Sequence, residues 1–131
     1  NPNGPYAAVI PLFINALKQN KPPVIFGDGN QMRDFTFVEN AVQANIKAAF
    51  TTNKAAIGQV FNIAVGEKTS VNDLYNFIKE LAGSSLEAIH TEERLGDIKN
   101  SFADISKAKT LLNYNPTVFI KDGLQKTYNS F

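Results

Sequence analysis

The sequence predicts a protein of the α/β class, an α+β lobe with a small mixed sheet of short strands and about five helices. Several segments carry apolar residues at helical spacing, and short β-type runs lie between them. Glycine, proline or asparagine closes most of these segments. No repeat, low-complexity tract or internal linker divides the chain, so we take residues 1–131 as one domain.

The N-terminal part predicts one helix and two short strands. Apolar residues recur at helical spacing between Tyr6 and Leu17, which predicts the first helix. Val24–Phe26 is a short β-type run, and Gly27–Asn30 is a turn sequence. A second short strand should follow at about 32–35.

The segment Thr36-Phe37-Val38-Glu39 has the pattern of a capping box, in which a threonine hydroxyl and a glutamate carboxylate bind backbone N–H groups at a helix start. A helix should run from there to about Phe50, with Gln43 and Lys47 facing water. Its predicted buried stripe is Val38, Val42, Ile46, Ala49 and Phe50.

In the second half, Val60–Ala64 is the strongest strand candidate, whereas the strand signal near 86–90 is weak. Ser70-x-x-Asp73 predicts the start of an amphipathic helix that ends at Gly83.

Two more helices follow. Asp104 can cap a short helix that ends at Asn113–Pro116, because a residue before proline avoids helical geometry. The spacing of Ile120, Leu124 and Tyr128 predicts a last helix.

Composition excludes several classes of function. Cysteine is absent, which rules out disulfide scaffolds and thiolate sites and fits a reducing, cytoplasmic location. The net charge is +1 with no basic run, so we expect no nucleic-acid partner. The longest apolar stretch, Ala7–Ile14, is far shorter than a membrane span, so we expect no membrane role. A single histidine cannot build a metal site alone, and none is expected.

The chain opens at Asn1–Pro5, a turn-rich segment without an initiator methionine. We therefore expect it to be a fragment of a longer protein.

Only two of the 13 basic residues are arginines, Arg33 and Arg94, and both adjoin turn glycines and an aspartate. A planar guanidinium can bind two phosphate oxygens at once, so the rarity of arginine elsewhere in the chain indicates that these two residues recognise an anion. Two guanidinium groups would suit a diphosphate. The alternative is that each arginine forms a structural surface bridge with its neighbouring aspartate, worth at most ~1 kcal/mol.

Other motifs point to structure more than to chemistry. Tyr75-x-x-x-Lys79 has the spacing of a catalytic pair, but no nucleotide-binding βαβ unit precedes it, so we interpret it as a helix-surface pair. His90 is interpreted as a solvent-side residue. Gly27-Asp28-Gly29 leads to a strand rather than a helix and reads as a turn. The chain contains no G-x-G-x-x-G fingerprint, so we expect no NAD bound to it.

Six segments follow one another in a familiar order. They are Pro2–Pro11, Phe26–Gly29, Arg33–Phe35, Val38–Val42, Phe61–Ala64 and Arg94–Asp97. This ordered series resembles the C-terminal half of extended short-chain dehydrogenases acting on nucleotide sugars, the NAD-dependent epimerase/dehydratase family. Within it, Asn3–Pro11 and Phe35–Asn40 are most similar to UDP-N-acetylglucosamine 4-epimerases.

The resemblance implies the substrate-binding lobe of an NAD-dependent UDP-sugar 4-epimerase, an isomerase of the UDP-N-acetylglucosamine/UDP-glucose type with a Rossmann-type fold. Such enzymes oxidise the sugar C4 hydroxyl with NAD and return the hydride to the other face. The NAD-binding Rossmann domain, the catalytic residues and the helices of the homodimer would lie upstream. We therefore expect no catalytic residue in this chain and no activity from it alone.

The resemblance also implies binding roles for a UDP-sugar. Arg33 and Arg94 would hold the diphosphate, Asp97 would reach a ribose hydroxyl, and Val24, Ile25 and Phe26 would flank the uracil. Ala7 and Ala8 would line the diphosphate and sugar end, and small residues at Ala8 and Ser101 would leave room for an N-acetyl group.

Two positions depart from the family pattern. Phe35 stands where galactose-type enzymes carry tyrosine, so a hydroxyl contact is lost there. Asn40 stands where many relatives have aspartate, which leaves its hydrogen-bonding role open.

A nucleotide-sugar dehydratase or decarboxylase and a non-catalytic interaction module are the alternative functions.

Overall fold

The computed structural model describes residues 8–131. Within them, five α-helices, one 3-10 helix and five short strands alternate along the chain. In order they are α1 (Val9–Lys18), β1 (Val24–Phe26), β2 (Met32–Arg33), α2 (Val38–Ala49), η1 (Lys54–Ala56), β3 (Thr69–Ser70), α3 (Val71–Leu81), β4 (Ile89–Thr91), β5 (Asn100–Ser101), α4 (Ser106–Leu112) and α5 (Ile120–Asn129).

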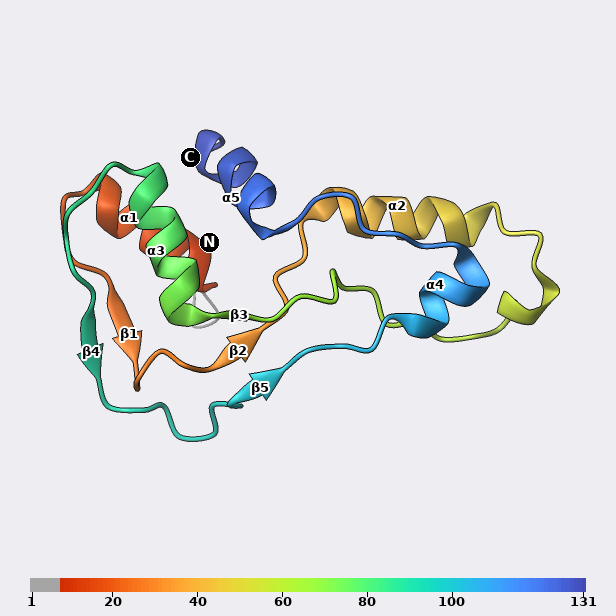
Figure 1. Cartoon of the computed structure of the whole chain (residues 1–131), viewed down its shortest axis with the longest axis horizontal. Helices are drawn as coiled ribbons and strands as arrows, with labels where there is room; N and C mark the ends of the chain where they lie inside the picture. The colour runs from red at the N-terminus through yellow and green to blue at the C-terminus, as the bar shows by residue number, and fades with distance from the viewer. Residues whose placement is uncertain (1–7) are drawn as a thin grey trace.

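The molecule is elongated, with one group of elements at each end (Figure 1). One end holds α1, α3, α5 and the strand pair β1 and β4, whereas the other end holds α2 and α4. Strands β2, β3 and β5 lie between the two ends. Each end has a hydrophobic core of its own.

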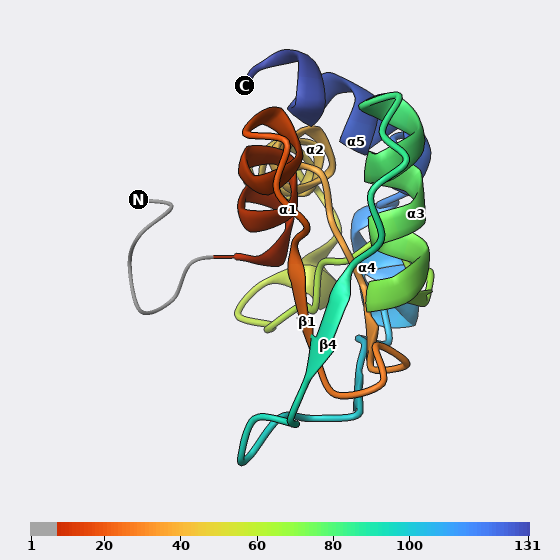
Figure 2. The same cartoon turned by 90° about the vertical axis from the view of Figure 1, so that its left-hand side faces the viewer.

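The strands form two small sheets. β1 pairs in parallel with β4, with Val24 opposite Ile89 and Phe26 opposite Thr91, and Figure 2 shows the two strands side by side. β2 pairs antiparallel with β3 and parallel with β5. The predicted α/β class with short mixed strands and five helices is confirmed, although the strands are divided between two sheets.

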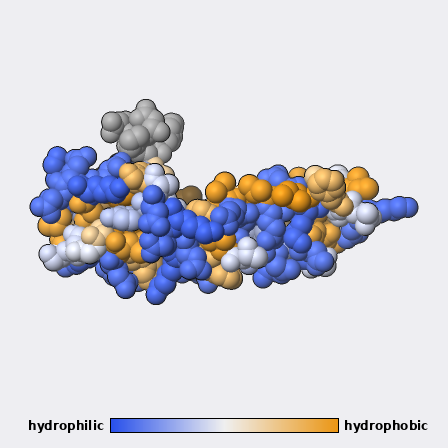
Figure 3. Space-filling model, turned by 90° about the horizontal axis from the view of Figure 1, so that it is seen from above, coloured by the Kyte–Doolittle hydropathy of each residue, from blue (hydrophilic) through white to orange (hydrophobic). Residues whose placement is uncertain are grey.

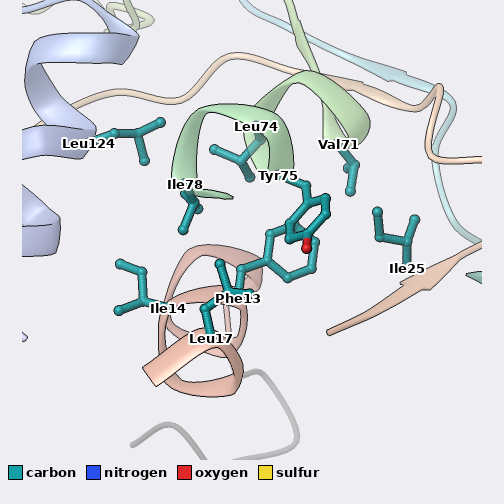
Figure 4. Packing of buried hydrophobic residues seen from close by; sticks show 9 residues of the cluster. All are labelled: Phe13, Ile14, Leu17, Ile25, Val71, Leu74, Tyr75, Ile78 and Leu124. Carbon is teal, nitrogen blue, oxygen red and sulfur yellow. The ribbon is translucent and has the colours of Figure 1, made fainter. Parts of the chain in front are cut away.

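The first core lies between α1, α3, α5 and β1. Its centre is an edge-to-face contact between Phe13 and Tyr75, whose ring centroids are 5.4 Å apart (Figure 4). Such aromatic pairs add to the free energy gained by burying apolar area. The buried members are Phe13, Ile14, Leu17, Ile25, Val71, Leu74, Tyr75, Ile78 and Leu124.

The second core, at the other end, is built largely of small side chains. Alanines from α2, η1, α4 and the segment at Ala64 make up four of its seven buried members. Tyr114 fills the space between them, and its hydroxyl donates a 2.7 Å hydrogen bond to the carbonyl of Ala64. The buried members are Ala44, Ala56, Ala64, Ile105, Ala108, Leu112 and Tyr114.

Several predicted elements are confirmed with small shifts of their ends. α1, β1, α3 and α5 form where apolar spacing predicted them. Ser70 caps α3, because its side chain accepts a hydrogen bond from the backbone N–H of Asp73. Gly83 follows α3 with a φ of +59°, a conformation that glycine adopts without strain.

The predicted capping box at Thr36 is wrong. α2 begins at Val38, its N-cap residue is Phe37, and no side chain caps it. Glu39 does not fold back on the helix start, because Lys126 of α5 binds its carboxylate at 2.7 and 2.9 Å. Thr36 instead lines a small apolar pocket beside α5.

The predicted strand Val60–Ala64 is also wrong, since it joins no sheet among residues 8–131. Phe61 and Ile63 pack against the second core, whereas Val60 is 84% exposed. A strand needs a hydrogen-bonded neighbour as well as β-forming residues. No described segment supplies one here.

The predicted buried stripe of α2 is exposed. Val38, Val42, Ile46, Ala49 and Phe50 face outward, and the residues that α2 buries are Asn40 and Ala44. Seen from above, a band of apolar surface runs along one edge of the half of the molecule that holds α2 (Figure 3). The amphipathic pattern is real, but the described chain offers nothing that covers its apolar side.

No helix among the described residues combines the length and apolar character needed to cross a membrane.

Candidate functional site

A cavity of about 370 Å³ lies where β1 meets the loop that follows β4. Ligand sites typically fall between about 300 and 1,000 Å³, so its size suits a small molecule. Six of the sequence-predicted site residues line it: Val24, Ile25, Phe26, Arg33, Arg94 and Asp97.

The register of the two parallel strands builds this cavity. Thr91 is the partner of Phe26, and its carbonyl accepts a 2.9 Å hydrogen bond from the N–H of Gly27. The loop after Thr91 therefore passes over the end of β1 and returns towards β2 and β5. Gly96, with a φ of +84°, permits the turn in which the N–H of Asp97 donates to the carbonyl of Arg94.

Arg33 is held firmly at the end of β2. Its Nη1 donates to the carbonyls of Met32 at 2.8 Å and Ile98 at 2.6 Å, and its Nη2 donates to Oδ1 of Asp97 at 2.6 Å. A guanidinium has five N–H donors, so three bonds fix its orientation and leave others for a ligand. The group is thus preorganised at the cavity wall.

The ion pair between Arg33 and Asp97 joins two segments far apart in the sequence. The expected alternative was a bridge between each arginine and its neighbouring aspartate. Instead Asp34 accepts hydrogen bonds from the N–H groups of Val65 at 3.0 Å and Gly66 at 2.8 Å. Asp34 is therefore a structural ligand of the backbone, and Arg33 is bound by the aspartate of the other motif.

Arg94 makes a different contact. Its guanidinium lies over the ring of Phe26, with Cζ 3.9 Å from the ring centroid. Among residues 8–131 it has no hydrogen-bond or ion-pair partner. The two arginines therefore approach one cavity, one of them fixed by hydrogen bonds and the other resting on an aromatic ring.

The remaining sequence-predicted residues lie apart from the cavity wall. Ser101 is exposed in β5, where it is the register partner of Arg33. Ala8 is exposed at the N-cap of α1, next to the lining residue Val9. Ala7 lies outside the described residues.

Sequence reasoning missed Gln31 as a site residue. Its Nε2 donates to the carbonyl of Phe26 at 2.9 Å and lies 3.5 Å from Oδ2 of Asp97. Gln31 therefore connects the end of β1 to the aspartate that holds Arg33. Its position two residues before Arg33 in an extended segment puts both side chains on one face, which was the available signal.

The other lining residues are Val9, Leu12 and Phe13 from α1, Val71 from α3, and Leu95 and Gly96 from the exposed loop after β4.

The Tyr75 and Lys79 spacing is not a surface pair, because Tyr75 is buried in the first core. Its hydroxyl donates to the carbonyl of Leu86 at 2.7 Å, and Lys79 pairs with Glu87. Burial raises the pKa of Tyr75, against a smaller opposing effect of Lys79. A proton-exchanging tyrosine needs a lowered pKa, so this environment opposes catalysis.

His90 is exposed, as predicted, with Nδ1 2.8 Å from the carbonyl oxygen of Gly27.

The described residues do not fit a dinucleotide. A Rossmann site needs a glycine-rich turn between a strand and a helix, where the backbone approaches the pyrophosphate. The strand-to-helix connections here, at 34–37 and 102–105 and directly from Ser70 into α3, contain no glycine. NAD therefore has no site built by these elements.

The relatives of this chain include UDP-glucose 4-epimerases and a UDP-N-acetyl-alpha-D-glucosaminuronate decarboxylase of Bacillus cytotoxicus, which is 33% identical over 98% of this chain and 41% of that protein. A family model described as the NAD dependent epimerase/dehydratase family matches residues 1–64. A putative UDP-glucose 4-epimerase of Methanocaldococcus jannaschii is 38% identical over 123 residues, which cover 94% of this chain and 38% of that protein.

Solved structures agree over nearly the whole chain. The UDP-glucose 4-epimerase of Thermotoga maritima, solved with UDP-glucose, matches with a TM-score of 0.89 at 34% identity, covering 98% of this chain and 40% of its own. The UDP-N-acetylglucosamine 4-epimerase of Methanobrevibacter ruminantium M1, in complex with UDP-N-acetylmuramic acid, matches with a TM-score of 0.86 at 37% identity and the same coverages, 98% and 40%. This chain spans about two fifths of the length of these proteins.

Proposed function

This chain belongs to the NAD-dependent epimerase/dehydratase family, and we propose on that premise that it is the nucleotide-sugar-binding lobe of a longer UDP-sugar 4-epimerase. In this proposal the lobe holds UDP. The remainder of the longer protein binds NAD and carries out the oxidation and reduction at C4 of the sugar.

The observation that carries the proposal is the convergence of both arginines on one cavity. Arg33 and Arg94 are the only arginines of the chain, and they lie 61 positions apart in the sequence. Both line the same cavity, together with the aromatic ring of Phe26. Two guanidinium groups beside an aromatic ring suit a diphosphate joined to a flat base.

Each group has a role in this proposal. Arg33 offers its remaining N–H donors to one phosphate, with Asp97 and two carbonyls keeping it in place. Arg94 binds the other phosphate, and Phe26 stacks on the uracil. Among residues 8–131, Oδ2 of Asp97 has only a long contact with Gln31, and its lone pairs are suited to accept a hydrogen bond from a ribose hydroxyl.

The sugar is proposed to be an N-acetylhexosamine of the UDP-N-acetylglucosamine type. Ser101 is the ladder partner of Arg33, so a small side chain stands next to the proposed clamp. Ala8 is small as well and precedes the lining residue Val9. Small residues at both positions leave volume for an acetamido group, which a larger side chain would occupy.

The exposed apolar stripe of α2 supports the proposal that this chain is one lobe of a longer protein. Val38 is 63% exposed, Ile46 54% and Phe50 81%. A contiguous apolar face on a helix is typical of a surface that another part of a protein covers. We propose that the NAD-binding part of the longer protein packs against this face of α2.

Titration of the isotope-labelled chain with UDP tests the binding role. We expect saturable shifts of the backbone amide signals of Phe26, Arg33 and Arg94, with weak affinity because one lobe supplies only part of the contacts. Arg33→Ala should remove the shifts. Lys121→Ala is the matched control, since it deletes a positive charge that lies over the ring of Phe77, away from the cavity. Unmoved spectra at millimolar UDP would contradict the proposal and favour an interaction module.

Activity requires the longer protein. Incubation of this chain with NAD and UDP-N-acetylglucosamine should yield no epimer, whereas a protein that also carries the NAD-binding part should yield it. Turnover by this chain alone would contradict the division of roles.

A further inference from the structure

Arg94, the proposed phosphate ligand, contacts the ring of Phe26, the proposed stacking surface for the uracil. The guanidinium lies 3.9 Å above the ring centroid, which is stacking distance. Both side chains line the same cavity. A guanidinium and a pyrimidine base cannot occupy one ring face at the same time, so a base that stacks there must displace Arg94.

The restraint on Arg94 is weak. Where Arg33 has three hydrogen bonds, Arg94 has the aromatic contact alone among residues 8–131. It belongs to an exposed segment, 91–102, and the neighbouring Leu95 is fully exposed. An exposed cation–π contact is a weak interaction, and Gly96 lets the loop turn at this point.

A phosphate is a stronger partner for the same guanidinium. Charge-assisted bidentate hydrogen bonds to phosphate oxygens exceed a solvent-exposed cation–π contact in strength. A diphosphate next to Arg33 would therefore draw Arg94 away from the ring. Once Arg94 leaves, the ring face is available to an aromatic base, for which stacking is favourable.

We propose that Arg94 makes base stacking on Phe26 depend on the diphosphate. Without phosphate the guanidinium covers the ring, and with phosphate it moves to the phosphate oxygens and uncovers it. This inference rests on the proposed function, because UDP is the ligand that carries both groups. Arg94 thereby becomes a specificity-determining residue that favours a nucleoside diphosphate over the nucleoside.

Proton chemical shifts of Arg94 report its position directly. The Cζ of Arg94 lies 3.9 Å from the ring centroid, so the ring current should shift the protons of the neighbouring Cδ upfield. Saturating UDP should return them to their ordinary position, while the ring signals of Phe26 shift through contact with the base. Uridine alone should produce little of either change.

Variants separate competition from simple charge loss. Arg94→Ala should strengthen uridine binding about two- to fivefold, because the competitor for the ring is gone. The same variant should weaken UDP binding about tenfold or more, because a phosphate contact is lost. Adding Phe26→Leu to Arg94→Ala should abolish the gain for uridine. Lys121→Ala should change neither affinity.

The two proposals fail in different ways. If UDP binds and the Arg94 signals stay upfield, or if Arg94→Ala weakens UDP without strengthening uridine, the switching role is wrong and the UDP site stands. If UDP shifts no cavity signal in the unmodified chain, both the site and the switch are wrong.

Discussion

Asn40 illustrates how one buried side chain joins two distant segments. It lies in α2 and is fully buried. Its Nδ2 donates to the carbonyl of Val118 at 2.7 Å, and its Oδ1 accepts from the N–H groups of Thr117 and Val118 at 3.0 and 3.1 Å. These bonds define the hydrogen-bonding role of Asn40, which the sequence had left open. An ionised carboxylate could accept the two bonds but could not donate to the carbonyl.

Asn40→Asp should therefore destabilise the chain. The substitution removes the only donor that reaches the Val118 carbonyl from this side chain and places a charge opposite its oxygen. We expect the free energy of unfolding to fall by about 2 kcal/mol, measured by urea denaturation. Asn45→Asp is the control, because Asn45 lies exposed on the same helix. Equal effects of the two substitutions would contradict this account of Asn40.

Tyr114 is the largest fully buried side chain of the second core. Burial raises the pKa of its hydroxyl, and the nearby carboxylate of Asp34 raises it further. Tyr75 in the first core has a raised pKa for the same first reason. In the unfolded chain both phenols ionise near pH 10, before those of the folded chain.

These shifts predict alkaline destabilisation. Where the unfolded chain has lost a proton that the folded chain keeps, the free energy of unfolding falls as pH rises. The contribution is fully present below about pH 10 and is lost as pH increases towards the folded pKa. Tyr114→Phe should reduce this pH dependence, and it should also cost about 1–3 kcal/mol at neutral pH, because the buried carbonyl of Ala64 loses its donor. Urea denaturation at several alkaline pH values measures both effects. An unchanged alkaline slope in the variant would contradict the assignment.

Among the helices and strands, the sequence correctly predicted those whose formation depends on residues nearby in the chain. The position of α3 follows from its own residues, because the Ser70 cap, the apolar spacing and Gly83 all act within the helix. The segment 60–64 has equally clear β-forming residues, yet strand formation depends on a neighbour that the described chain does not provide. The burial of the α2 stripe likewise depends on what packs against it. Patterns identify a face as apolar but do not identify its partner.

The same distinction applies to the cavity. The sparing use of arginine and the turn glycines predicted Arg33 and Arg94, and the structure brings both to one cavity. Pairing between Arg33 and Asp97 spans 64 positions and arises only from the arrangement of β1, β4, β2 and β5. Adjacent aspartates were the natural candidates in the sequence. The connection through Gln31 was missed for the same reason, because Phe26 and Asp97 approach it only in the fold.

The Ser70 cap gives a prediction for α3. Ser70→Ala removes the acceptor of the Asp73 N–H and should lower the free energy of unfolding by about 1 kcal/mol. Because α3 packs against both α1 and α5, the loss should appear in global thermal unfolding and not only as fraying of the helix. Ser85→Ala serves as the control, since Ser85 is exposed beyond the end of α3 and its side chain has no hydrogen-bond partner among residues 8–131. Equal midpoints for Ser70→Ala and the unmodified chain would contradict the cap.

At the scale of the whole molecule, the two cores differ in the size of their side chains. The first core has aromatic and branched aliphatic residues on three helices, whereas the second is mostly alanine around Tyr114. Larger buried side chains remove more apolar area from water, so the first core contributes more to stability. The end with the smaller core is also the end where α2 leaves its apolar stripe in solvent. These two features together fit a half that completes its packing against another part of a longer protein.

An uncovered stripe of this kind should make the chain associate with itself, and that association should depend on α2. Ile46→Lys places a charge in the middle of the stripe, where burial against a second copy would be costly. We expect it to raise the apparent dissociation constant about tenfold in sedimentation velocity runs over a range of concentrations, since tenfold corresponds to about 1.4 kcal/mol. Because Ile46 is exposed, the free energy of unfolding of the monomer should change by less than about 0.5 kcal/mol. Phe131→Ser removes an apolar side chain of comparable exposure, 47% against 54% for Ile46, at the other end and should leave association unchanged. Association that persists in Ile46→Lys but is lost in Phe131→Ser would locate the contact away from α2 and remove the support that its exposed stripe gives to the role of a lobe.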